Sequence, residues 1–193
     1  SVCQLNFVRA LYGDHPYGRS SLGTKEGVAS LTTSDLRKFY TDYIQQKRAV
    51  ISTVGSFSSE SWQEEMAGIL SKLPASGKDP LSPVSAKPIS KTQVVFEKKE
   101  PLFQSHILVG FQAADFGDPD RLALKLLSSA LAGQGGRLFL ELRDKQSLAY
   151  TVAPMNSDTP ERGMFGFYIG CSPEKMATSI QGIRREIEKV LEA

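Results

Sequence analysis

Cysteine and histidine are scarce in this sequence, and long hydrophobic runs are missing. The 193 residues include two cysteines, Cys3 and Cys171, which belong to no CxxC or CxH pair. A secreted disulfide scaffold normally carries more cysteines, so that class is disfavoured, and whether these two form one disulfide stays open. No stretch approaches the roughly 18 apolar residues of a transmembrane helix, and no signal peptide opens the chain. We expect a soluble protein with no membrane span, either cytoplasmic or, if a signal lies outside this chain, periplasmic or exported.

An excess of charge of one sign is also missing. The chain holds 23 lysines and arginines against 21 aspartates and glutamates, a formal net charge of +2. Proteins that bind nucleic acid or an anionic membrane usually show a strong basic excess. We therefore expect no nucleic acid among the partners of this chain. With 40% hydrophobic and 23% charged residues, the composition is typical of a globular protein that buries a core.

The motifs of metal and nucleophilic catalysis do not occur either. A catalytic zinc needs three protein ligands, and the two histidines, His15 and His106, lie in no HxxEH or HxH motif. We predict no metal site within this chain: His15 is interpreted as a loop or capping residue, and His106 as a hydrogen-bonded residue of a strand. No GxSxG or SxxK motif marks a serine nucleophile. The glycines within residues 133–136 follow a predicted helix and not a strand, which favours a turn over a phosphate loop.

The first part of the chain shows helical apolar spacing interrupted by one strand-like run. We predict a helix over 2–12, a loop over 13–18, a helix capped by Thr33 or Ser34, a strand over 48–55, and a helix starting at a Ser61–Glu64 capping box. Residues 74–91 are rich in proline and serine and carry no periodic apolar face. We interpret them as an extended linker between two structural units.

The chain after the linker follows a ββααββα order. Strands are predicted over 93–98 and 104–113, joined by a turn around Glu100 and Pro101, and over 149–155 and 163–171. Helices are predicted after Asp118, over 137–145, and from Ser172 to the end. On the first of these helices, we expect the inward-facing residues to be Ala123, Leu126, Leu127, Ala130 and Leu131. This order predicts an α+β fold, with helices packed on one face of a mostly antiparallel sheet.

Two motifs resemble those of a known family. Residues 136–150 read GRLFLELRDKQSLAY, which is similar to the motif RLFxxLRxxxxLAY of the inverted-zincin metallopeptidases related to insulinase, pitrilysin and mitochondrial processing peptidase. Residues 15–36 contain HPYGR, LGT and LTTSDL in the order of the same family's HPYGRxxxGTxExxxxLTxxDL run. Glycines stand at 135 and 136, where the family usually has small hydroxyl residues. The resemblance spans the whole chain.

The resemblance implies a place within a larger peptidase. Family members have two homologous α+β domains that close around an extended peptide. Residues 1–73 would be the C-terminal part of the first domain, 74–91 the linker, and 92–193 the N-terminal part of the second domain. The HxxEH helix that binds the zinc cofactor would precede Ser1. This chain alone is therefore expected to hold no cofactor and to be inactive, and whether its parent is an enzyme depends on that helix.

The resemblance also points to two site residues. The family's arginine and tyrosine correspond to Arg143 and Tyr150. An arginine offers a permanent charge and a planar set of donors for peptide carbonyls, and a tyrosine hydroxyl can donate to an oxyanion. The pair is expected to bind substrate and stabilise the transition state opposite a zinc on the other domain. Without the motif, a helix-terminal arginine and a half-buried strand tyrosine would be the simpler interpretation.

Three functions stay open on the sequence alone. The chain is the non-zinc part of a zinc-dependent peptidase that encloses a peptide or unfolded polypeptide, or part of a catalytically inactive partner or structural subunit, or a free-standing peptide-binding module. Its partner would be the zinc-binding domain of the same chain or of another subunit, and a homodimer is an alternative. Because an unpaired strand exposes a hydrophobic edge, we also expect 48–55 and the Trp62 helix to complete the second sheet, as in a circular permutant or by exchange between two copies.

Overall fold

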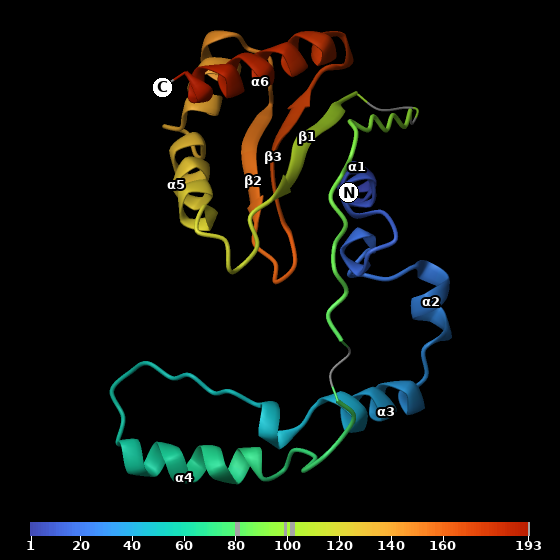
Figure 1. The fold of residues 1–193 in the computed structure, drawn as a ribbon, viewed down its shortest axis with the longest axis vertical. Coiled ribbons are helices and arrows are strands. Elements are labelled where there is room, and N and C mark those ends of the chain that lie inside the picture. The colour runs from blue at the N-terminus through green and yellow to red at the C-terminus, as the bar shows by residue number, and fades with distance from the viewer. Residues whose placement is uncertain (80–81, 99, 101–102, 193) are drawn as a thin grey trace. The chain divides into compact units, whose positions relative to one another are not determined.

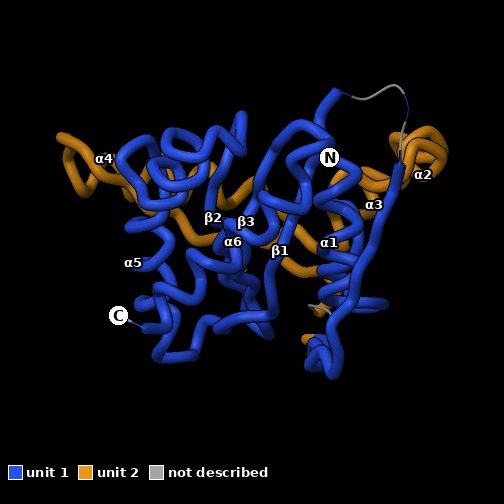
Figure 2. Tube along the Cα trace, turned by 90° about the horizontal axis from the view of Figure 1, so that it is seen from above, with its two compact units in different colours: residues 1–21, 84–193 blue, residues 22–83 orange. Residues whose placement is uncertain are grey.

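The chain forms two compact units in the computed structural model, which describes residues 1–79, 82–98, 100 and 103–192. Residues 1–21 and 84–193 make up one unit, coloured blue in Figure 2, and residues 22–83 make up the other, coloured orange. We call them the sheet unit and the helical unit. Residues 80–81 of the predicted linker and Pro101 of the predicted turn lie outside the described residues.

The sheet unit is built on a three-stranded antiparallel sheet with the order β1-β3-β2. Its strands are β1 (Ser105–Ala113), β2 (Thr151–Ser157) and β3 (Gly163–Cys171), and β3 lies between the other two (Figure 1). In the register of the sheet, Phe167 of β3 is the partner of Val109 in β1 and of Pro154 in β2. Three of the four strands predicted after the linker are confirmed, within two residues at their ends.

One face of this sheet carries the hydrophobic core. Phe165 and Ile169 of β3 are buried there in one cluster with Leu131, Leu142 and Ile183 from the covering helices. The covering elements are α5 (Arg121–Leu131), the π-helical segment η3 (Phe139–Lys145) and α6 (Met176–Leu191), and the short turn η4 (Pro173–Lys175) leads into α6. The predicted α+β class is confirmed.

The other face of the sheet is covered in part by the N-terminal helix, α1 (Val2–Tyr12), which packs against β1. The Phe7 ring lies so close to the strand that a Cβ on Gly110 would come within 2.8 Å of the ring's Cζ atom. The glycine therefore leaves room for the aromatic ring. Cys3 of this helix and Cys171 of β3 are both free thiols, so no disulfide links them.

The segment 84–89 is tied to both α1 and β1. Gln112 of β1 donates from Nε2 to the carbonyls of Leu11 (2.7 Å) and Lys87 (2.9 Å), and its Oε1 accepts from the N–H of Ile89 (3.0 Å). One side chain thus satisfies backbone groups of two other segments that are far from it in sequence. This part of the proline-rich stretch is bound to the sheet unit.

The helical unit contains α2 (Lys25–Ser30), α3 (Thr33–Tyr43), the short turn η2 (Gln46–Arg48) and α4 (Ser59–Leu70). Within its described part, the one buried residue is polar: Gln45 donates from Nε2 to the carbonyls of Asp42 (3.2 Å) and Lys78 (2.9 Å). The Asp42 carboxylate pairs with Lys78 (2.9 Å) and Lys38 (3.2 Å). Polar contacts therefore fasten the end of α3.

Two predicted strands are not formed. Residues 48–55 and 93–98 have no strand structure, so the predicted completion of the sheet by 48–55 and the Trp62 helix within one chain is wrong. Completion by exchange between two copies stays a prediction. A strand is stable only where a neighbour pairs with its N–H and C=O groups. Residues 48–55 lie in the helical unit. The described residues of that unit form no strand with which they could pair. Val50 and Val54 are accordingly 93% and 98% exposed.

Two helix starts differ from the prediction. The cap of α3 is Thr32, which forms a reciprocal capping box with Asp35, and neither Thr33 nor Ser34 serves. The cap of α4 is Ser58, whose Oγ accepts from the N–H of Ser61, so the predicted Ser61–Glu64 box is wrong. Hydroxyl residues close together offer several caps of similar quality, and the pattern does not choose among them.

The inward face of α5 was predicted correctly only in part. The helix begins at Arg121, not directly after Asp118. The predicted Leu127 and Leu131 face the core, together with Leu124, which was not predicted. Leu126, expected inside, is 74% exposed, and Ala123 and Ala130, also expected inside, are exposed as well. A leucine-rich helix offers two apolar stripes, and only the position of the sheet selects one of them.

Candidate functional site

The two candidate residues flank the connection between η3 and β2, and apolar side chains anchor that connection. Leu138 directly before η3, Leu142 within it and Leu148 after it are buried members of the core cluster. Leu138 and Leu142 stand four positions apart, on one side of the helical segment. A Cβ on Gly182 of α6 would come within 2.8 Å of Leu142 Cδ2, so this leucine fits closely against α6.

A tight turn reverses the chain after η3. The N–H of Ser147 donates to the carbonyl of Arg143 (2.9 Å), and the N–H of Leu148 donates to that of Leu142 (2.8 Å). Ser147 has a φ of 50°, a left-handed conformation that usually requires glycine. Lys175 donates from Nζ to the Ser147 carbonyl (2.8 Å). These hydrogen bonds hold the turn in a conformation that serine by itself does not favour.

Arg143 lies on the exposed side of η3. Its Cζ atom is 4.7 Å from the centroid of the Phe139 ring, a cation–π contact between residues four positions apart. On the same segment Lys145 pairs with Glu141 at 2.6 Å, which lowers the pKa of the Glu141 carboxyl. No carboxylate in the described part of the chain pairs with Arg143. Its guanidinium is therefore free to receive an acceptor from outside.

Tyr150 lies where the chain reaches the sheet. Its N–H donates to the carbonyl of Gly170 in β3 (2.8 Å), one residue before β2 begins. Its side chain is nevertheless turned to solvent, because the residue is 61% exposed. The structure thus places Arg143 and Tyr150 on the surface at the two ends of one anchored turn. That both act on one substrate stays a prediction.

The two histidines have structural partners. His15 is buried and caps the short turn η1 (Pro16–Gly18): its Nδ1 accepts from the N–H of Tyr17 (3.2 Å), and its Nε2 donates to the carbonyl of Val84 (2.6 Å). His106 lies with Nδ1 2.7 Å from the Tyr168 hydroxyl. Both roles match those predicted. Across the residues that the structure describes, no group of three or more His, Cys, Asp or Glu side chains could hold a metal ion.

The HPYG segment is fastened to the connection between β2 and β3. The Tyr17 hydroxyl donates to the Glu161 carboxylate, and the Tyr12 hydroxyl donates to the Arg162 carbonyl (3.0 Å). Burial raises the pKa of Tyr12 to about 12, so this hydroxyl remains a donor at neutral pH. The segment is thus a packing element of the sheet unit, a role that sequence reasoning did not assign.

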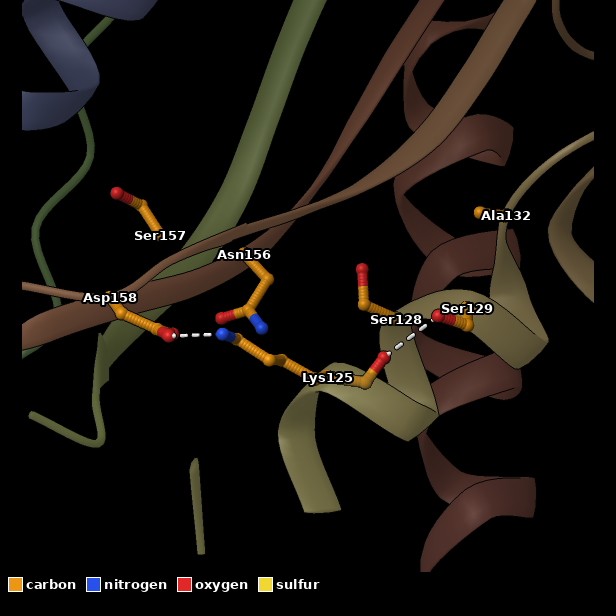
Figure 3. Close-up of a pocket in the computed structure, with 7 residues that line it drawn as sticks. All are labelled: Lys125, Ser128, Ser129, Ala132, Asn156, Ser157 and Asp158. Atoms are coloured by element: carbon orange, nitrogen blue, oxygen red, sulfur yellow. Dashed lines mark hydrogen bonds and ion pairs between the residues drawn. The ribbon is translucent and has the colours of Figure 1, made fainter. Parts of the chain in front are cut away.

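An open pocket lies between α5 and the end of β2 (Figure 3). Its lining residues are Lys125, Ser128, Ser129, Ala132, Asn156, Ser157 and Asp158. The Asp158 carboxylate is compensated by Lys125 (2.8 Å) and Arg121 (3.8 Å). Sequence reasoning missed this pocket because its two walls come from elements far apart in the chain. It contains neither Arg143 nor Tyr150.

Comparison with known protein families identifies the family of this chain. A protein-family model described as the peptidase M16 inactive domain matches residues 30–193. This chain belongs to that family. The resemblance indicated by the two sequence motifs is confirmed.

Curated relatives of this M16 chain are named as zinc proteases. It is 28% identical over 194 residues to an uncharacterized zinc protease of Streptomyces coelicolor, covering 96% of this chain and 42% of the relative. It is 31% identical over 184 residues to an uncharacterized zinc protease of Bacillus subtilis, covering 95% of this chain and 43% of the relative. The M16 chain therefore spans less than half the length of these relatives.

Solved structures share the fold of this M16 chain. A protease from Helicobacter pylori matches with a TM-score of 0.86 at 25% identity, covering 99% of this chain and 46% of that one. A peptidase M16 inactive domain from Pseudomonas fluorescens matches with a TM-score of 0.83 at 23% identity and the same coverage.

None of the helices formed by the described residues is both long and apolar enough to cross a membrane.

Proposed function

We propose that this M16 chain is the non-zinc part of a zinc-dependent peptidase, and that it helps to enclose and orient an extended peptide substrate. In this proposal residues 1–73 end the first domain of the peptidase, 74–91 link the domains, and 92–193 begin the second. The zinc-binding domain is supplied by the same chain or by a partner subunit. The zinc-protease names of the curated relatives support this assignment.

One observation carries the proposal: Arg143 and Tyr150 are exposed, although the residues beside them are anchored in the core. Leu142 precedes Arg143 directly and is fully buried, and Leu148 lies two positions before Tyr150 with 6% exposure. Groups that orient a substrate must be held to within about 0.5 Å, which requires rigid support from their neighbours. An exposed charge and an exposed aromatic hydroxyl on a rigid turn meet that requirement.

The chemistry of the two side chains suits a peptide backbone. Arg143 brings a permanent charge and several N–H donors, which can bind one or two carbonyl oxygens of an extended chain. Tyr150 brings one O–H donor that can bind the oxyanion formed when a peptide carbonyl is attacked. Removal of one such donor from an enzyme typically lowers kcat by about 10²- to 10³-fold.

The zinc named for the relatives does not fit the residues of this chain. The sequence has two histidines and no HxxEH motif, and the described residues contain no cluster of metal ligands. Zinc ligands therefore belong to the other half of the peptidase in this proposal. The part assigned to this chain is substrate binding through Arg143 and Tyr150.

The test is kinetic and uses the assembled peptidase, with its zinc-binding half on the same chain or a second subunit. Tyr150→Phe should lower kcat for an unstructured peptide by about 10²- to 10³-fold, because it removes one donor to the oxyanion. Arg143→Ala should also raise KM, because it removes a contact made with the bound substrate. Both variants should unfold at the wild-type temperature, since both side chains are exposed.

Tyr40→Phe is the matched control, because Tyr40 is another exposed tyrosine that lies in the helical unit. It should leave kcat and KM unchanged. If both site variants kept wild-type kcat/KM, the proposal would fail, and a structural or partner-subunit role would replace it.

A second expectation concerns the chain by itself. Because it lacks HxxEH, the purified 193-residue chain should contain no stoichiometric zinc and should not cleave an unstructured peptide. Elemental analysis and a peptide-cleavage assay measure both properties. One bound zinc per chain, together with cleavage that a chelator abolishes, would contradict the proposed division of roles.

A further inference from the structure

The Phe139 ring and the Arg143 guanidinium form a pair that the proposed function does not yet explain. Leu138, which directly precedes η3, and Leu142 of η3 belong to the core cluster and have no exposed surface. Phe139 and Arg143 each follow one of these leucines, so they share the neighbouring side of the same segment. Burial of the two leucines therefore places the Phe139 ring, and the Arg143 guanidinium packs against that ring.

The contact is the one interaction that the structure shows for the Arg143 side chain within the described residues. The acidic residue of the same segment, Glu141, is already paired with Lys145. A carboxylate partner would consume N–H donors of the guanidinium in hydrogen bonds. A cation–π contact holds the charge and leaves those donors available.

A long side chain without a partner would otherwise sample many rotamers, and a ligand would have to order it on binding. An aromatic ring fixed beside it reduces that cost before the ligand arrives. Lys145 differs, because its ammonium group is paired with the Glu141 carboxylate and has fewer N–H donors available for a ligand.

We propose that Phe139 is a positioning residue, which holds the Arg143 guanidinium over its ring with the N–H donors free for the carbonyl oxygens of an extended peptide. The inference rests on the proposed function, because it assigns to Phe139 the pre-organisation of one of the two substrate-binding groups. Phe139 itself acts through Arg143.

The experiment is a double-mutant cycle in the assembled peptidase, with an unstructured fluorogenic peptide as substrate. Phe139→Leu keeps an apolar side chain but removes the aromatic face, and it should lower kcat/KM by about 3- to 30-fold. Phe139→Tyr keeps the aromatic face and should stay within about twofold of wild type. In the Arg143→Ala background, Phe139→Leu should cause no further loss, because the group it positions is gone.

Phe116→Leu is the matched control. Phe116 also has an arginine over its ring, with Arg121 Cζ 5.9 Å from the centroid, but this pair lies outside the η3 segment. The same chemical change there should leave kcat/KM unchanged. An equal loss in Phe116→Leu would mean a general effect on the fold and would overturn the inference.

A spectroscopic readout follows the contact without any activity. The Phe139 ring current should shift the side-chain proton resonances of Arg143 upfield in the 193-residue chain, and Phe139→Leu should abolish that shift. If Arg143→Ala impaired hydrolysis while Phe139→Leu did not, the inference would fail and the proposed function would stand. If Arg143→Ala caused no loss, the proposed function would fail, and the positioning role with it.

Discussion

The sheet unit and the helical unit contain amphipathic helices of the same kind, but their apolar residues end in different surroundings. In α6 of the sheet unit, Ile183 is fully buried in the core cluster. In α3 of the helical unit, Leu36 and Phe39 are 60% and 59% exposed. A sheet lies under α6, whereas the helical unit forms no strand in its described part.

Apolar spacing therefore predicts a helix but not the burial of its apolar face. Helices as short as α3 are marginal in water unless other contacts support them. In the helical unit those contacts are polar: a capping box at Thr32 and the ion pairs of Asp42 at the other end. In the sheet unit, apolar packing supplies the support. The two units should therefore respond differently to the same substitutions.

The largest contrast is expected from two phenylalanines. Phe165→Ala removes a side chain that is 1% exposed and should lower the free energy of unfolding by about 3–5 kcal/mol, through lost burial and a cavity. Phe39→Ala removes an exposed side chain and should change it by less than about 1 kcal/mol. Urea unfolding of the purified chain, followed by circular dichroism, measures both. Equal losses would mean that the apolar face of α3 is buried in solution, and the two units would not differ in this respect.

A smaller effect is expected from the buried ion pair of the sheet unit. Glu186 is 2% exposed and accepts from Arg137 Nε (2.9 Å) and Lys189 Nζ (2.6 Å). Glu186→Gln keeps the volume but removes the charge, and it should lower the free energy of unfolding by about 1–3 kcal/mol. The loss is limited to this range because both cations are partly exposed. Urea unfolding measures the loss, and Glu188→Gln on the exposed side of α6 is the control. A neutral Glu186→Gln variant would contradict the role assigned to this pair.

The smallest effect is expected from the surface ion pairs of the helical unit. Hydrogen bonds from Lys78 and Lys38 hold the pKa of Asp42 below its ordinary value of 3.8. Because the folded pKa is the lower one, the stabilisation is present at neutral pH and is lost as the pH falls through 3.8 and below. Titration of the Asp42 carboxyl carbon by NMR should give a midpoint under 3.8, and Lys78→Met should raise it. A midpoint at or above 3.8 in the wild-type chain would refute the contact.

Local signals were enough to predict much of the sheet unit. The strand 163–171 and the helix 2–12 were predicted with their observed ends, because alternation, helical spacing and the flanking turn residues agree there. The residues at 48–55 and 93–98 show the limit of this reasoning. Their composition is typical of strands, but a strand needs a partner, and the pattern carries no information about one.

The candidate site likewise has residues that the sequence predicted and features that it did not. Arg143 and Tyr150 were found through the motif; both are exposed, and their role in substrate binding stays a prediction. The contact of Phe139 with Arg143 was available from the spacing of four positions, but nothing in the pattern singled it out. The burial of Glu186 and the left-handed Ser147 were not predictable, because tertiary contacts with Arg137 and Lys175 produce them.

Photocrosslinking can show directly whether Tyr150 contacts the substrate. In the assembled peptidase, Tyr150→p-benzoylphenylalanine places a photoreactive ring at the proposed site, and Tyr40→p-benzoylphenylalanine places the same ring in the helical unit. After irradiation with a labelled unstructured peptide, mass spectrometry should find the peptide linked to residue 150 and not to residue 40. Equal labelling at both positions, or none at residue 150, would contradict the proposed role of Tyr150.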